Sequence, residues 1–157
     1  MKYLKDYSIE EYTNALSLRV PTPGGGSAAA LTAALGTALF GMVARYSLDR
    51  GSTREVEHHI KKIVKECDKI QQTFLRYVDD DAKAYQRVVK ARKGTKQQQK
   101  AADNAARKIQ QKVRLLCYRM IALAPFLVKK GNPHLAADVG VAGELLLSAY
   151  NSAEILA

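Results

Sequence analysis

The feature that most constrains this fold is a loop of prolines and glycines, Pro21 to Ser27, followed by a long run without charge. The two prolines exclude regular structure and favour extended backbone before them. The three glycines allow the chain to come close to a neighbouring segment. Residues 28–44 hold no charged side chain, which predicts a helix buried on most of its sides. We expect this helix to run from about Gly26 to Leu48, with Ser27 capping its start.

A glycine loop that opens a helix has chemical consequences of its own. The first backbone N–H groups of a helix have no partner inside it, and the helix dipole is positive at that end. Such a loop suits an anion or a polar ring. A tight turn in front of a core helix uses the same residues, so the loop by itself leaves both interpretations open.

The remaining segments also predict helices. A capping box at Ser8 and Glu11 starts a short helix to about Leu18, and a second box from Ser52 to Glu55 starts a long one to about Arg92. Thr95 and Gln98 form a weaker box before a segment from Lys96 to about Lys130, where Pro125 should introduce a kink. Asn132 caps a last helix that begins at Pro133. The side chains expected on the buried side of the first helix are Ile9, Tyr12, Leu16 and Val20.

These elements predict one domain, residues 1–157, of the all-α class. With 47% hydrophobic residues and no strand pattern, we expect an antiparallel helical bundle with long helices around a buried central helix. The long uncharged helix also favours a dimer, because its small residues would let a second subunit approach.

Charge and cysteine content restrict the partners. The net charge of +10 attracts anions, whether nucleic acid, anionic lipid or a polyanionic small molecule. Nucleic acid is not favoured, because few aromatic residues interrupt the basic segments. Cys67 and Cys117 lie on apolar stripes without a CxxC motif, which predicts free thiols in the cytoplasm and no metal site. The first residues lack a signal peptide pattern, and the apolar run is short for a membrane span.

Two carboxylates fall where a core residue is expected. Asp81 continues the long stripe that includes Val78 and Tyr85, and Asp138 lies between Leu135 and Ala142 on the last helix. A carboxylate facing a core needs a partner or a function. Pairing with a cation or a helix N-terminus would explain each one, and so would a catalytic role. Asp79 and Asp80 fall off the stripe and should be solvated.

Three blocks of sequence resemble one known family. Residues 21–30 (PTPGGGSAAA), 78–85 (VDDDAKAY) and 131–142 (GNPHLAADVGVA) resemble, in this order, motifs of the cyclodeaminase/cyclohydrolase family. The resemblance covers essentially the whole chain. It implies an all-helical homodimer with a folate site near the subunit interface, and either cyclisation of 5-formiminotetrahydrofolate with loss of ammonia or hydrolysis of 5,10-methenyltetrahydrofolate.

The resemblance also implies site residues. The catalytic candidates are Asp81, as acid and base, and Asp138, as an orienting or pterin-binding group. No tightly bound cofactor is implied, since the tetrahydrofolate derivative is the substrate. Two alternatives stay open: a non-catalytic helical homodimer with the same fold, and a basic nucleic-acid-binding helical protein. The substrate-binding candidates are Pro23, Gly24, Gly25, Gly26, Ser27, Asn132 and Arg50.

Overall fold

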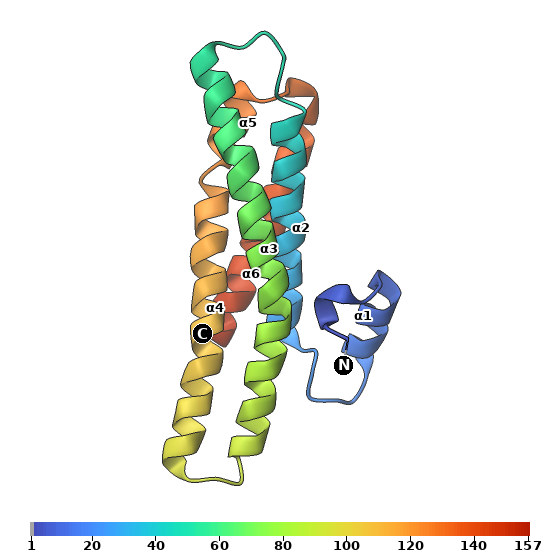
Figure 1. Cartoon of the computed structure of the whole chain (residues 1–157), viewed down its shortest axis with the longest axis vertical. Helices are drawn as coiled ribbons and strands as arrows, with labels where there is room; N and C mark the ends of the chain where they lie inside the picture. Colours follow the sequence, from blue (N-terminus) through green and yellow to red (C-terminus); the bar gives the residue numbers. More distant parts are fainter. Residues whose placement is uncertain (1) are drawn as a thin grey trace.

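The structure is a computed structural model that describes residues 2–157, and all regular structure within them is helical. The all-α prediction is therefore confirmed. Four long helices lie side by side, with α2 and α4 each packed against both α3 and α6 (Figure 1). The α-helices are α1 (Ile9–Ser17), α2 (Gly25–Arg45), α3 (Arg54–Ala91), α4 (Lys96–Ile121), α5 (Ala124–Lys130) and α6 (Ala136–Leu156), with single 3₁₀ turns at η1 (Leu4–Asp6) and η2 (Pro133–Leu135).

Helix α2 is the buried helix that its composition predicts, although it ends at Arg45 rather than Leu48. Its small side chains let the neighbouring helices come close. A methyl group added at Gly36 would lie 2.9 Å from both the carbonyl oxygen of Ala142 and Cγ of Leu146 on α6. By length and composition α2 could cross a membrane, but 61% of its most apolar window is buried inside this protein. Burial in the bundle accounts for its lack of charge.

Helix α3 carries the stripe predicted from its spacing. Ile60, Phe74 and Val78 are among its fully buried side chains and Asp81 is half-buried, but Tyr85, which the predicted stripe also included, is 40% exposed. The helix starts one residue later than the capping box suggested, because Thr53 provides the cap and accepts a hydrogen bond from the amide of Val56. At one end of the bundle, α3 and α4 extend beyond the start of α2 and the end of α6 (Figure 1).

Helix α1 begins with the predicted capping box, in which Ser8 and Glu11 exchange hydrogen bonds. Its predicted buried side is wrong except for Tyr12, because Ile9 is 87% exposed and Leu16 and Val20 are also exposed. The reason is visible in Figure 1, where α1 lies beside the bundle rather than inside it. A helix that touches a core along one narrow line buries few of its apolar residues.

The segment after α4 differs from the predicted kinked helix. The capping box at Thr95 and Gln98 is present, but α4 ends at Ile121 and α5 starts anew with Pro125 in its first turn. Proline is tolerated there because the first N–H groups of a helix have no intrahelical partner. Pro125 therefore separates two helices instead of bending one.

Asn132 does cap the next element, but that element is the 3₁₀ turn η2. The side-chain oxygen of Asn132 accepts a hydrogen bond from the amide of His134. Helix α6 begins only at Ala136. The fully buried side chains of α6 are Val139, Ala142, Leu146, Ala149 and Ala153. Of the predicted core positions of this segment, Ala142 and Ala149 are fully buried, and Asp138 is half-buried one turn before Ala142.

Candidate active site

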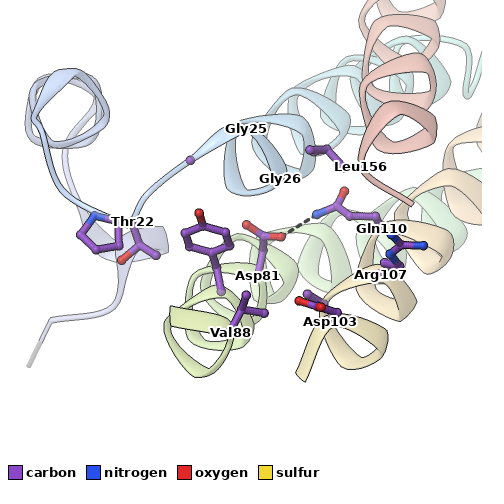
Figure 2. A pocket seen from close by; sticks show the side chains of 13 residues that line it. Thr22, Gly25, Gly26, Asp81, Val88, Asp103, Arg107, Gln110 and Leu156 are labelled. Atoms are coloured by element: carbon purple, nitrogen blue, oxygen red, sulfur yellow. Dashed lines mark hydrogen bonds between the residues drawn. The ribbon is translucent and has the colours of Figure 1, made fainter. Parts of the chain in front are cut away.

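A pocket of about 540 Å³ opens where the proline–glycine loop meets three helices. The loop and the first turn of α2 form one wall, α3 and α4 form two more, and Leu156 at the end of α6 closes it (Figure 2). The side chain of Asp81 points into this space from α3. Arg107 and Asp103, both exposed on α4, lie at its rim.

Asp81 is held by a glutamine that sequence reasoning did not find. The Nε2 group of Gln110 donates a hydrogen bond of 2.6 Å to Oδ1 of Asp81. Gly26 lies directly against this pair: a Cβ atom there would fall well inside 3.0 Å of both groups. The glycine at position 26 is therefore required by close approach. A helical position normally accommodates a side chain, but at position 26 it would collide with the Asp81 carboxylate.

The environment of Asp81 favours proton exchange. Burial raises its pKa above the ordinary value, while the hydrogen bonds from the Gln110 side chain and the Ser27 backbone amide lower it, with a net upward shift of the pKa. A carboxyl with a raised pKa is a better general acid than a solvated one and still serves as a base. Asp81 thus combines access to a pocket with a perturbed pKa, the two properties expected of a catalytic group.

The first turn of α2 contributes backbone groups, not the predicted serine cap. Gly24 occupies the capping position with extended backbone, and Ser27 is already the third residue of the helix. The Ser27 hydroxyl is fully buried and shares a 2.8 Å hydrogen bond with the Tyr12 hydroxyl. Its predicted capping role is wrong, because the helix already begins at Gly25 and Gly24 is the capping residue. Of the loop candidates, Gly24, Gly25 and Gly26 line the pocket, while Pro23 is buried.

The other predicted site residues lie at the far end of α2. The amide of Asn132 donates a 2.8 Å hydrogen bond to Ser47 Oγ, and its side chain donates to the carbonyl of Tyr46, just past the end of α2. The 21 residues of α2 separate this end from the glycine loop by about 30 Å. Arg50 is exposed in the following loop, and Asp138 starts α6 nearby. A single chain therefore does not bring Asp138 and Asp81 together.

Asp79 corrects another expectation. It is only 6% exposed, not solvated, and its Oδ1 accepts a 2.6 Å hydrogen bond from the amide of Leu4. It fixes the N-terminal turn η1 onto α3. The adjacent Asp80 is exposed as predicted. The two neighbours thus differ because the N-terminal segment covers one of them, which no local pattern in α3 reveals.

Gln110 could have been found by its register. It lies three residues before Val113 and seven before Cys117, and all three are buried on the same face of α4. Ile109, one residue earlier, is only partly buried. A buried amide on an apolar stripe requires a partner, which is the same argument that singled out Asp81.

The pocket contains the Asp81 carboxyl with its raised pKa, the Gln110 amide that holds it, and the start of the uncharged helix α2. The protein is therefore all-helical with a pocket suited to acid–base chemistry. Comparison with known proteins makes this specific. The chain belongs to the formiminotransferase-cyclodeaminase family, whose model matches residues 8–156. The predicted resemblance is therefore confirmed.

Individual relatives agree with this family. The methenyltetrahydrofolate cyclohydrolase of Methylorubrum extorquens is 31% identical over 153 residues, which cover 91% of this chain and 72% of that protein. The formimidoyltransferase-cyclodeaminase of Mus musculus is 29% identical over 111 residues, 71% of this chain but only 20% of that larger protein. The crystal structure of formiminotetrahydrofolate cyclodeaminase from Thermotoga maritima superposes with a TM-score of 0.94 at 24% identity, covering 98% of this chain and 77% of that one. At this identity the superposition establishes the shared fold.

Proposed function

We propose that this chain is a folate one-carbon enzyme that cyclises 5-formiminotetrahydrofolate with release of ammonia or hydrolyses 5,10-methenyltetrahydrofolate. The observation that carries the proposal is Asp81, a carboxyl of raised pKa that points into a pocket beside the N-terminus of α2. The names of the relatives support the substrate class, since they include both a cyclohydrolase and a cyclodeaminase.

The chemistry of both reactions fits a single carboxyl. Each proceeds through a cationic carbon flanked by nitrogen and a tetrahedral adduct. In cyclisation a ring-closing nitrogen bonds to that carbon and loses a proton, and the formimino nitrogen gains a proton and leaves as ammonia. In hydrolysis water bonds to the carbon and loses a proton, and a ring nitrogen gains one as its bond to that carbon breaks. The hydroxyl of the adduct releases its remaining proton to solvent as the formyl C=O forms. Asp81 would stabilise the cation and carry the proton between these atoms.

The walls of the pocket provide binding groups for a folate. The backbone amides at the start of α2, at Gly25 and Gly26, are suited to an oxygen of the pterin ring. Arg107 stands at the rim and also lines a smaller adjoining groove with Lys96 and Lys100 of α4. We place the anionic tail of the folate along these cations, which the net charge of +10 would also attract.

A homodimer would complete the site. Large apolar side chains are exposed on two helices that pack together: Leu35 on α2 is 55% exposed and Val141 on α6 is 53% exposed. We propose that a second copy covers this face in an antiparallel arrangement of the bundles. The far end of α2 in one subunit, with Asn132 and Asp138, would then lie near the pocket of the other. A monomer in sedimentation at micromolar concentration would contradict the dimer.

The proposed activity is tested by turnover in the cytoplasmic conditions that we expect for this protein. The loss of 5,10-methenyltetrahydrofolate is followed by its absorbance, and 5-formiminotetrahydrofolate is assayed by ammonia release. Asp81→Asn should abolish turnover of the substrate that the wild type uses, with helicity unchanged. Asp80→Asn is the matched control, because Asp80 is an exposed neighbour outside the pocket and should retain full activity. Full activity of Asp81→Asn, or no turnover of either folate by the wild type, would refute the proposal.

A further inference from the structure

Gln110 is an unusual residue to find on the buried face of a helix. Its side chain is only 2% exposed, in register with the apolar Val113 and Cys117. An amide at such a place lowers stability unless both of its polar groups are paired. Only Nε2 is paired, with Asp81, while Oε1 is buried without a partner in the part of the chain that the structure describes. The fold therefore tolerates an unsatisfied group in order to keep this amide against the carboxyl.

The orientation of the amide follows from the charge of its partner. An ionised carboxylate accepts hydrogen bonds and cannot donate them, so only the NH₂ end of a glutamine can face it. Figure 2 shows this arrangement, with Nε2 toward Asp81 and the oxygen directed away, on the side of Leu156. Gly26 packs directly against the pair from α2, where any side chain would collide with both groups.

We propose that Gln110 is a positioning residue for Asp81, which fixes the carboxylate against the first turn of α2 and favours its proton-accepting form. This inference rests on the proposed function of Asp81. The amide itself exchanges no proton and forms no covalent bond. Asp81 takes the proton from the attacking water or nitrogen and returns it to the departing nitrogen, and Gln110 holds the carboxylate in place through both transfers.

The groups around Asp81 are consistent with this role. Arg107 and Asp103 of α4 carry opposite charges at the rim, and Tyr85 of α3 also lines the pocket. From the α1 side comes Tyr12, whose own pKa is raised first by burial and further by the nearby carboxylates. The hydrogen bond from Gln110 lowers the pKa of Asp81 more than the hydrogen bond from the Ser27 amide does.

The test replaces Gln110 by methionine, which has a similar length and no polar end. Gln111→Met is the matched control, because Gln111 is the exposed next residue on the same helix. With Gln110→Met we expect the acid limb of the profile of kcat against pH to move to higher pH. We expect kcat at neutral pH to fall roughly ten- to hundredfold, the rate equivalent of one hydrogen bond to a charged group, with KM nearly unchanged. The control should behave as the wild type.

A titration separates this inference from the proposed function. The Asp81 carboxyl is followed by ¹³C NMR in the wild type and in Gln110→Met, with no substrate present. A higher pKa of Asp81 in Gln110→Met than in the wild type supports the positioning role, whether or not either folate is turned over. Absence of turnover would refute only the proposed function. An unchanged titration, or a change in KM alone, would overturn the inference.

A second variant covers the case in which Gln110→Met does not fold. Gln110→Glu keeps the length and the hydrogen bond while the two carboxyls share one proton, and the pair repels once both are ionised. Its activity should therefore be confined to lower pH than that of the wild type. A wild-type profile for Gln110→Glu would contradict the positioning role.

Discussion

Substitution of Gly26 by alanine tests the geometry of the pocket most directly. The new Cβ would lie 2.5 Å from Cγ of Asp81, whereas ordinary van der Waals contact begins at 3.4 Å. The difference, about 0.9 Å, is the distance by which Asp81 or α2 must retreat. The same atom would collide with Nε2 of Gln110, so the two partners of the 2.6 Å hydrogen bond are both displaced.

The magnitude follows from three contributions. Overpacking costs about 1–3 kcal/mol and loss of a hydrogen bond to a charged group about 1.5–3 kcal/mol, while alanine in a helix returns about 1 kcal/mol relative to glycine. We therefore expect Gly26→Ala to lower the free energy of unfolding by about 1.5–5 kcal/mol. Catalysis should lose about a hundredfold, because a displacement near 1 Å misplaces the carboxyl relative to its substrate.

The assay pairs denaturant unfolding with turnover at a temperature where the variant is folded. Gly36→Ala is the matched control on the same helix. Its Cβ would lie 2.9 Å from atoms of both Ala142 and Leu146, so it also overpacks the bundle, but about 15 Å from Gly26 along α2. We expect Gly36→Ala to lose stability and keep its kcat. Equal losses of kcat in both variants, or an unaffected Gly26→Ala, would refute the reasoning.

Three further predictions concern stability and reactivity. Because the pKa of Asp81 is raised in the folded state, the folded chain binds this proton more tightly than the unfolded chain, and its stability falls as the pH rises above the ordinary pKa of 3.8. Asp81→Asn should therefore be more stable than the wild type at neutral pH. Urea unfolding below pH 3.8 should show no difference between the two proteins. Asn132→Ala removes the cap of η2 and a link to the end of α2, and should lower the free energy of unfolding by about 1–3 kcal/mol in the same experiment. Burial raises the pKa of Cys67 and Cys117 to about 12, so both thiols should react with a neutral-pH thiol reagent only as the chain unfolds, and rapid labelling of the native protein would contradict this.

Local patterns predicted the helices well because capping and periodicity act within a few residues. Ser8 with Glu11 and Thr95 with Gln98 start their helices as predicted, since each box satisfies backbone groups within one turn. The buried stripe of α3 followed from its spacing of threes and fours.

The errors arose where a distant segment or an unforeseen break decided the outcome. Asp79 was expected in solvent, but the N-terminal turn covers it and donates to it. Ile9 is exposed because α1 lies beside the bundle. In each case the local pattern was sound, and packing against another element overrode it.

By itself the sequence determined the all-helical class, the buried central helix, the motifs of the family and the choice of Asp81 as a candidate site residue. All of these depend on residue type, spacing and capping, which act over short distances. Only the tertiary structure decided that Gln110 from α4 and Gly26 from α2 enclose that carboxyl, and that Asn132 and Asp138 lie at the other end of α2. A pocket is made by side chains from helices far apart in the chain, and their meeting depends on how those helices pack.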